Sequence, residues 1–334
     1  MRDRGDVRMS EARPDPSLAA VLIGRNEGER LIRCLASIRG QIGRIVYVDS
    51  GSTDGSVAAA LAAGADVVQL DTRLPFTAAR ARNAGLAALR EGGPLPEFVQ
   101  FVDGDCEVQP GWIETARRFL EARPRAAVAC GRRRERFPQA SVYNRLCDAE
   151  WDTPVGEAFA CGGDALMRRE ALDQVGGYNP SLIAGEEPEM CVRLRAKGWQ
   201  IWRLDAEMTV HDAAIMRLSQ WWKRMKRAGH AYAEGAHLHP GGGLGEAGQR
   251  RALLWGLALP VLAVSGTVFT PLAPGLFLLW PLQVVRLAAR DRFSHFGWQM
   301  GFFNTLGKLA EAQGALEFHL RRLTGQRSGL IEYK

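Results

Sequence analysis

Short apolar runs alternate with amphipathic stretches through the first part of the chain. The apolar runs, which predict buried strands, are residues 18–23, 45–48, 67–70, 98–102 and 126–130. The helix-like stretches between them are residues 29–38, 53–63, 77–89 and 111–121. Strands and helices that alternate at this spacing predict an α/β fold, in which helices flank a mostly parallel sheet wound with right-handed crossovers.

Polar segments follow the first, second and fourth predicted strands, at residues 24–27, 49–55 and 103–105. Because the carboxyl ends of parallel strands meet at one edge of a sheet, we expect all three to open on one crevice. Asp49 is placed to accept hydrogen bonds from a ribose or a base. The Gly-Ser-Thr-Asp turn that follows it has a simpler interpretation as the cap of the next helix.

Two carboxylates, Asp103 and Asp105, stand one residue apart at the end of the fourth strand. They can hold a hard divalent cation against the phosphates of a substrate, although Asp-Gly-Asp also occurs in ordinary solvated turns. Arg80 and Arg82 lie in the first turns of the preceding helix. The planar fork of arginine suits a diphosphate, whereas most helical arginines are surface residues.

Three glutamates, Glu186, Glu187 and Glu189, open an amphipathic helix that ends near Gly198. Acidic residues in a first turn are favoured by the helix dipole, so a capping role is one interpretation. The other is that a glutamate at the mouth of the crevice takes a proton from an attacking hydroxyl. His211 follows a strand-like stretch around residues 201–202 and is either a structural histidine or a metal ligand beside the aspartates.

Composition narrows the class of protein. The net charge is +6, but the arginines are scattered and acids are nearly as numerous, so no nucleic-acid partner is predicted. The one tight basic cluster, residues 132–136, predicts either a solvated loop after a strand or a site for phosphate or lipid headgroups. Neither a Gly-x-Gly-x-x-Gly motif nor a Gly-Lys-Ser/Thr phosphate loop is present, which argues against dinucleotide-binding dehydrogenases and P-loop enzymes.

The cysteines and the start of the chain indicate the compartment. The six cysteines form no Cys-x-x-Cys pair, and the start of the chain is charged, without the apolar core of a signal peptide. We expect reduced thiols and cytoplasmic residence for most of the chain.

The chain has no charged residue between Arg251 and Arg286. Residues 252–269 and 272–285 predict a helical hairpin, since two spans of ~18 to 20 residues just cross a ~30 Å hydrocarbon core. Arginines at both ends place these ends on the cytoplasmic side. Because four prolines interrupt the run, a re-entrant loop and a soluble helical pair are alternatives.

Aromatic and basic residues flank the hairpin. Residues 220–227 combine paired tryptophans with basic residues, and aromatic residues recur at 293, 296, 298, 302 and 303. Both segments predict interfacial helices on anionic headgroups. The alternative is that their aromatic side chains pack on the catalytic domain.

With these residues assembled, residues 18–235 resemble a family-2 glycosyltransferase with the GT-A nucleotide-sugar-binding fold. The family's Asn-Glu matches residues 26–27, and its Val-Asp-x-Gly-Ser-Thr-Asp matches residues 48–54. Its Ala-Arg-Asn-x-Gly matches residues 81–85, and its Asp-x-Asp matches Asp103 and Asp105. The resemblance implies inverting transfer of a sugar from a nucleoside diphosphate donor, helped by Mg²⁺ or Mn²⁺.

The same resemblance implies roles for individual residues. The nucleotide-sugar-binding residues would be Asn26, Glu27, Asp49, Arg82, Asn83, Asp103, Gly163 and Asp164, with Glu27 and Asp49 on the nucleoside, Arg82 on the diphosphate and Asp103 on the ribose. Asp105 would bind the metal, with Asp103 and His211 as further ligands. Glu187 aligns with the catalytic base and Glu186 is its rival, because this chain has Glu-Glu where the family usually has Glu-Asp.

We therefore expect a disordered tail at residues 1–17, a glycosyltransferase domain at 18–240, a membrane hairpin at 250–290 and an amphipathic C-terminal helix and tail at 291–334. The predicted protein works on the cytoplasmic face of the inner membrane with a glycan or lipid-linked acceptor. Two alternatives are a non-catalytic nucleotide-sugar binder and a nucleotidyltransferase. A processive polymerase is disfavoured, because no Gln-x-x-Arg-Trp motif is present.

Overall fold

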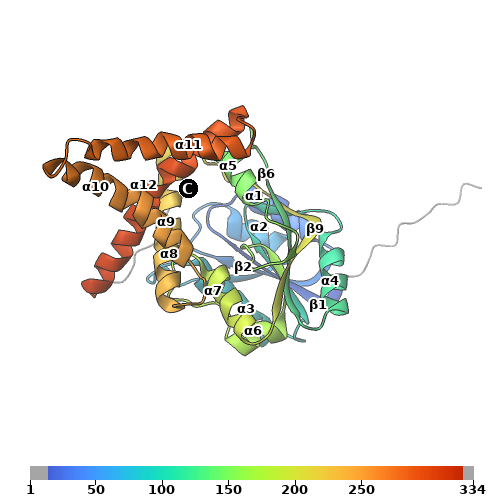
Figure 1. Cartoon of the computed structure of the whole chain (residues 1–334). Coiled ribbons are helices and arrows are strands. Elements are labelled where there is room, and N and C mark those ends of the chain that lie inside the picture. The colour runs from blue at the N-terminus through green and yellow to red at the C-terminus, as the bar shows by residue number, and fades with distance from the viewer. Residues whose placement is uncertain (1–13, 326–334) are drawn as a thin grey trace, which may run out of the picture.

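A single sheet organises the first two thirds of the chain (Figure 1). The structure, a computed structural model, describes residues 14–325. The sheet has nine strands in the order β3-β2-β1-β4-β8-β6-β9-β5, with β7 beside β9. The strands are β1 Asp15–Gly24, β2 Ile42–Asp49, β3 Asp66–Gln69, β4 Phe98–Asp103, β5 Cys106–Val108, β6 Ala126–Glu135, β7 Gly156–Glu157, β8 Ala165–Arg168 and β9 Gln200–His211.

In the described part of the chain, seven helices belong to the sheet domain, and the helices that follow them form a C-terminal assembly. Those of the sheet domain are α1 Glu29–Ile38, α2 Ser56–Ala62, α3 Ala78–Glu91, α4 Trp112–Ala122, α5 Val142–Glu150, α6 Arg169–Val175 and α7 Glu186–Ala196. The C-terminal helices are α8 Leu218–Leu238, α9 Glu246–Leu253, α10 Leu259–Ser265, α11 Leu279–Arg290 and α12 His295–Leu323. The predicted amphipathic periodicity sets which face is buried: α1 turns Leu31, Leu35 and Ile38 into the core.

The predicted parallel sheet forms in the first half of the domain. Strands β1 to β4 pair in parallel and are joined through helices. The second half mixes directions: β6 and β9 pair in parallel, whereas β8 runs antiparallel to β4 and β6, and β5 and β7 run antiparallel to β9. Strands β5, β7 and β8 have only two to four residues. Strands this short give little hydrophobic periodicity to detect.

The register of the sheet brings the predicted polar segments to one edge. Gly24 at the end of β1 pairs with Asp49 of β2, and Ile23 pairs with Asp103 of β4. The prediction of a shared edge is therefore confirmed. Large buried side chains such as Tyr47 and Phe101 fill the core behind this edge.

Two predicted boundaries need correction. Strand β6 continues to Glu135, so Arg132 to Arg134 lie in a strand and the loop interpretation of this cluster is wrong. Of the predicted tail, residues 1–13 lie outside the described residues, whereas Asp15–Ser17 begin β1.

The C-terminal helices pack closely on the sheet domain and on one another. A Cβ added at Gly229 of α8 would lie 1.9 Å from the Glu311 carbonyl oxygen, and one at Gly314 of α12 would lie 1.9 Å from that of Lys226. Glycine therefore lets α8 and α12 approach backbone to backbone. Trp221 of α8 packs against Tyr143 and Phe303, with ring centroids 6.0 and 5.2 Å apart. For Trp221 and Phe303, the alternative that the aromatic side chains pack within the protein is therefore correct.

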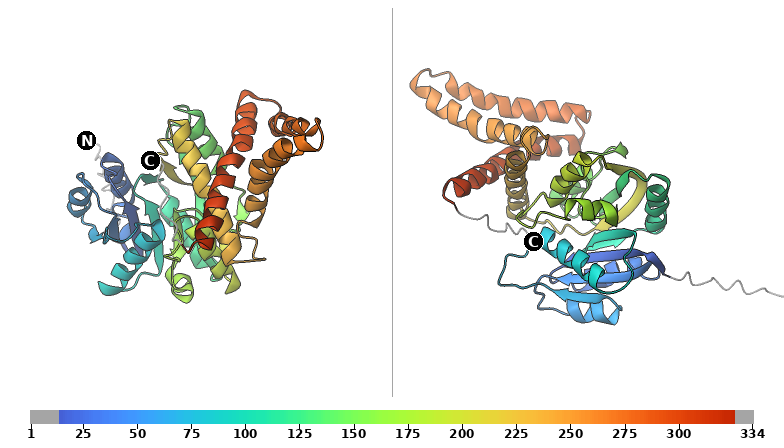
Figure 2. Two further views of the ribbon diagram at one scale, coloured as in Figure 1. Left: turned by 90° about the vertical axis from the view of Figure 1, so that its left-hand side faces the viewer. Right: turned by 90° about the horizontal axis from the view of Figure 1, so that it is seen from below.

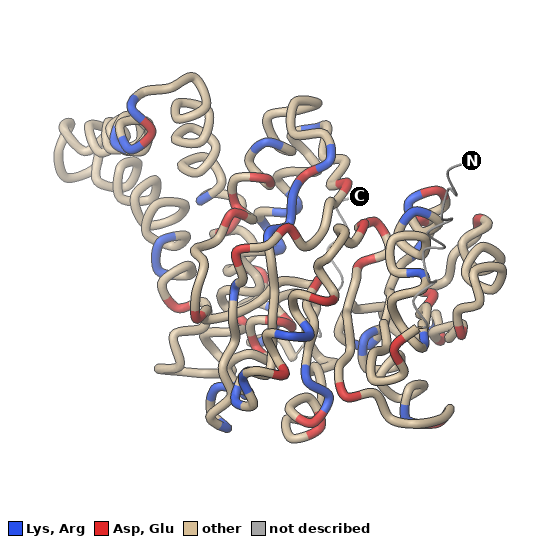
Figure 3. The backbone as a smooth tube through the Cα atoms, turned by 90° about the vertical axis from the view of Figure 1, so that its right-hand side faces the viewer, with Lys and Arg blue, Asp and Glu red and all other residues tan. Residues whose placement is uncertain are grey.

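A helical hairpin projects from this assembly (Figure 2). Its outgoing limb runs from α9 through a π-helical turn, Leu254–Ala258, and α10, and it returns through a 3-10 turn, Ala273–Leu278, and α11. Residues Glu246–Val268 form a helix of 23 residues that is long and apolar enough to cross a membrane, which is weak evidence by itself. Within residues 14–325 the returning limb does not meet that criterion, so the two predicted spans reduce to one candidate. Charged residues gather at the base of the hairpin and not along its limbs (Figure 3).

Candidate active site

A cleft of about 1310 Å³ opens at the carboxyl edge of the sheet. One arm is lined by the ends of β1 and β4, by the loop before β8 and by the start of α7. The other arm runs between α8 and α9, where Arg227, Tyr232 and Arg251 line it. The cleft therefore connects the sheet edge to the base of the hairpin.

Arg82 stands at the centre of a cluster of carboxylates in this cleft. Its Nη2 donates to Asp103 Oδ1 over 2.9 Å, and its Nη1 lies 3.0 Å from Glu186 Oε1 and 2.6 Å from Glu187 Oε1. The arginine is only 2% exposed. Helix α3, strand β4 and helix α7 thus converge on one buried guanidinium, which joins residues about a hundred positions apart in sequence.

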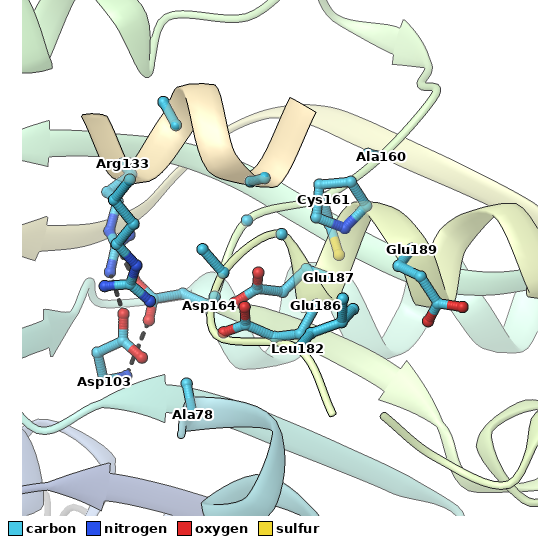
Figure 4. Close-up of a pocket in the computed structure, with 18 of the residues that line it drawn as sticks. Ala78, Asp103, Arg133, Ala160, Cys161, Asp164, Leu182, Glu186, Glu187 and Glu189 are labelled. Carbon is cyan, nitrogen blue, oxygen red and sulfur yellow. Dashed lines mark hydrogen bonds and ion pairs between the residues drawn. The ribbon is translucent and has the colours of Figure 1, made fainter. Parts of the chain in front are cut away.

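The two glutamates at the start of α7 point into the cleft. Gly185, in the left-handed conformation with φ 79°, begins the helix without a side-chain cap. Burial and the neighbouring Glu186 together raise the pKa of Glu187 to about 7, against the opposing attraction of Arg82. A carboxylate with a pKa near neutral pH is suited to general base catalysis. Glu189, by contrast, pairs with Arg193 and His239 and points away from the cluster (Figure 4).

A second arginine, Arg133 of β6, holds the opposite side of Asp103. Its Nη2 is 2.8 Å from Asp103 Oδ2, and its Nε is 3.1 Å from Asp164 Oδ2. The Asp103 amide donates to Asp164 Oδ1 over 3.0 Å, and the Thr209 hydroxyl donates to Asp164 Oδ2 over 2.7 Å. Although burial opposes ionisation, Arg82 and Arg133 lower the pKa of Asp103. Asp103 therefore stays ionised between two fixed cations.

Sequence reasoning did not select Arg133 as a site residue. The available signal was the basic cluster at residues 132–136, for which phosphate binding was one interpretation. Side chains alternate along a strand, so Arg133 turns into the cleft while Arg134 pairs with Glu207 on the surface.

Asp105 and His211 form a candidate cation site. Pairing of β5 with β9 sets Cys106 opposite His211, and His211 Nε2 lies 3.2 Å from Asp105 Oδ2. Ligand atoms of Asp105, Cys106 and His211 all lie within 4.8 Å of one another. Carboxylate oxygens suit Mg²⁺ and Mn²⁺, and imidazole is a common metal ligand, so these residues fit a divalent cation. Asp103 belongs to a separate group with Cys106 and Asp164, and arginines occupy both its oxygens.

The residues predicted to bind the nucleoside join two loops at the sheet edge. Asn26 has a left-handed φ of 56°. Its side-chain oxygen accepts from the Thr53 backbone amide over 2.7 Å, and its backbone amide donates to the Ser52 hydroxyl. Asn26 and Glu27 line the cleft. Asp49 lies buried behind them and accepts from the amides of Gly51 and Ser52, so it shapes the loop.

Two other predicted residues have distinct places. Asn83 exchanges two hydrogen bonds with the backbone of Tyr178 and does not line the cleft, so it holds the turn at residues 176–178 in position. Gly163 lies against the Arg82–Asp103 pair, where an added Cβ would be 2.7 Å from Arg82 Nη2 and 2.9 Å from Asp103 Oδ2. Only glycine leaves room for that pair.

Comparisons with known proteins indicate the family and the fold that this chain resembles. Residues 20–176 match the family model described as glycosyl transferase family 2. The pre-mycofactocin glycosyltransferase of Mycobacterium tuberculosis is 26% identical over 255 residues, which cover 70% of this chain and 52% of that protein. The succinoglycan biosynthesis protein ExoA of Rhizobium meliloti is 28% identical over 189 residues, which cover 54% of this chain and 57% of ExoA. The chain thus spans about half the length of the curated relatives it matches.

A solved structure shares the fold of almost the whole chain. The mannosyltransferase PcManGT from Pyrobaculum calidifontis, in complex with GDP-Man and Mn²⁺, aligns with a TM-score of 0.59 at 19% identity. The alignment covers 91% of this chain and 89% of that structure. Residues 20–176 are therefore similar to the glycosyl transferase family 2 domain, and the chain shares the GT-A fold of its structural neighbours.

Proposed function

We propose that this protein is a glycosyltransferase that moves a sugar from a nucleoside diphosphate to an acceptor hydroxyl, with inversion at the anomeric carbon. The observation that carries the proposal is the position of Glu187. Its carboxylate, with a pKa of about 7, lies in the same cleft as Asp103, Asp105 and His211 and is tied to Asp103 through Arg82. One crevice thus contains a base and groups suited to a diphosphate and its cation.

In the proposed reaction, Glu187 removes the proton of the acceptor hydroxyl as its oxygen attacks the anomeric carbon. The bond from that carbon to the diphosphate oxygen breaks, and its electron pair leaves with the diphosphate. Attack from the face opposite the leaving group inverts the anomeric configuration. Arg82 and Arg133 are placed to attract the diphosphate, because both guanidinium groups line the cleft.

A divalent cation, Mg²⁺ or Mn²⁺, held by Asp105 and His211 would offset the charge that develops on the departing diphosphate. The presence of GDP-Man and Mn²⁺ in PcManGT supports this proposal. The predicted nucleoside contacts of Asn26, Glu27 and Asp49 belong to the same proposal. Of these, Asn26 and Glu27 line the cleft, whereas Asp49 would act through the loop that it holds.

We further infer that the acceptor enters from the arm between α8 and α9. This arm leads to the apolar hairpin, whose tip exposes Val268, Phe269 and Leu272 by more than 80% each. A lipid-linked or growing glycan acceptor on the cytoplasmic face of the membrane fits this arrangement, since arginines flank both ends of the apolar segment. The name of ExoA supports a role in polysaccharide synthesis.

The test uses purified, detergent-solubilised protein with a panel of nucleoside diphosphate sugars, in EDTA and with Mn²⁺ or Mg²⁺. We expect metal-dependent release of a single nucleoside diphosphate, its loss in Asp105→Ala, and an inverted anomeric centre by NMR. Full activity of Asp105→Ala would contradict the cation site.

A second candidate is a nucleotide-sugar binder without turnover. It is favoured by one observation: Arg82 lies 2.6 Å from Glu187 Oε1, and a carboxylate paired with arginine is a weaker base. Donor binding without release of product, across acceptors that include a membrane extract, would establish this alternative.

A further inference from the structure

A second pocket, of about 410 Å³, lies at the base of the hairpin. Residues of α9 and the π-helical turn, α11 and α12 line it, and four of these carry positive charge: Arg251, Arg286, Arg290 and Lys308. In the part of the chain that the structure describes, no acidic side chain lines it. The pocket is therefore built to attract an anion.

Part of this charge is not neutralised by the protein. Lys308 Nζ contacts both oxygens of Glu311, at 2.8 and 2.6 Å, so that pair is balanced. Arg286 reaches only the amide oxygen of Gln283, at 3.4 Å. Among residues 14–325, no carboxylate forms an ion pair with Arg251, Arg286 or Arg290. Arg251 interacts electrostatically with Glu311, so the guanidinium groups of Arg286 and Arg290 are the two that face the pocket without a counter-charge among the described residues.

The surroundings of the pocket indicate where the anion comes from. Leu279 and Leu282 are exposed on α11, which supplies Arg286 and Arg290, and Leu254 is exposed just after the end of α9, which supplies Arg251. Trp255 lines the pocket itself. Arginines and tryptophan at the end of exposed apolar helices are typical of the headgroup level of a bilayer.

The pocket also borders the active-site cleft. Arg251 lines both cavities, from the end of α9 where the helix leaves the sheet domain. A group bound by Arg286 and Arg290 would therefore lie beside the arm through which the acceptor is proposed to enter.

We propose that this pocket binds the phosphate headgroup of an anionic membrane lipid and so fixes the base of the hairpin at the bilayer surface. The guanidinium groups would bind the phosphate through paired, charge-assisted hydrogen bonds, as arginine commonly does. This inference rests on the membrane docking in the proposed function, but it concerns binding and does not require turnover.

The experiment is vesicle flotation of the full chain with pure phosphatidylcholine and with phosphatidylcholine containing phosphatidylglycerol. The test variant is Arg286→Gln/Arg290→Gln. The matched control is Arg321→Gln/Arg322→Gln, which removes the same charge from the far end of α12. Each basic residue at an anionic surface contributes about 1 kcal/mol, so we expect roughly thirtyfold weaker binding to the anionic vesicles in the test variant only.

Arg286→Lys/Arg290→Lys keeps the charge but loses the planar fork of arginine, so it should bind the anionic vesicles more weakly than wild type and more tightly than Arg286→Gln/Arg290→Gln. Melting temperatures check that each variant is folded. Equal losses in the test and control variants would overturn the pocket in favour of diffuse electrostatics. Equal binding of wild type to neutral and anionic vesicles would overturn the pocket and leave membrane docking intact. Failure to bind either vesicle would overturn both, whereas the donor assay in detergent judges the proposed reaction independently.

Discussion

Adding one methyl group at Gly163 should disable the site, whereas adding one at Gly162 should not. The Cβ at Gly163 would lie 2.7 Å from Arg82 Nη2, although ordinary contacts begin at 3.4 Å, so the guanidinium must retreat by about 0.7 Å. At Gly162 an added Cβ meets nothing within 4 Å. Neither glycine has a positive φ, so backbone strain does not separate the two variants.

The expected size of the effect follows from this displacement. Arg82 holds Asp103, Glu186 and Glu187 through contacts of 2.6 to 3.0 Å, and a retreat of 0.7 Å cannot preserve all of them. A displacement of ~1 Å in a catalytic arrangement can cost about 100-fold in rate. We expect Gly163→Ala to lower kcat/KM by about 10- to 100-fold, which corresponds to ~1.4 to 2.7 kcal/mol.

The assay is donor turnover at saturating cation, with the melting temperature of each variant as the check on folding. Gly162→Ala should stay within about twofold of wild type, as substitutions into open space usually do. Full activity of Gly163→Ala, or an equal loss in both variants, would refute the argument that this glycine protects the Arg82–Asp103 pair.

Three further predictions follow from the site and the C-terminal helices. Glu187 must be ionised to act as a base, and its pKa is about 7. The value of kcat should therefore fall about tenfold per pH unit below pH 7 and level off above it. A kcat that does not change between pH 5.5 and 8 would contradict this role. Gly314→Ala should lower the melting temperature by several degrees, since overpacking costs about 1 to 3 kcal/mol and the added Cβ meets backbone, while Gly275→Ala, which meets nothing within 4 Å, should not. Arg133→Met should weaken donor binding in calorimetry, and unchanged affinity would remove Arg133 from the proposed diphosphate site.

The first half of the fold was predictable because its signals are local. Helix α1 spans the predicted residues 29–38, since its apolar positions recur with helical period. The polar ends of β1, β2 and β4 could be assigned to one edge because parallel strands share their direction. The position of Asp103 in the cluster around Arg82 could be predicted in the same way, since Asp103 lies at that edge.

The rest depends on contacts that local sequence does not encode. Strand β6 extends through charged residues because Arg133 forms ion pairs with Asp103 and Asp164, which lie elsewhere in the sequence. The pairing of Arg82 with Glu186 and Glu187 joins two helices that are about a hundred residues apart in sequence. The sequence around Trp221 fits a helix at a membrane surface as well as a packed one, and the contact with Phe303 of α12 is what shows that Trp221 is buried.

The central claim is that Glu187 takes the acceptor proton in a cleft that binds a nucleoside diphosphate sugar. The most direct measurement is single-turnover transfer by Glu187→Gln beside Glu186→Gln, with donor affinity measured for both. General base catalysis typically contributes 10²- to 10⁴-fold, so Glu187→Gln should lose about that much rate and keep its donor affinity, while Glu186→Gln retains more activity. Turnover by Glu187→Gln at the wild-type rate, or a larger loss in Glu186→Gln, would contradict the assignment of Glu187 as the base.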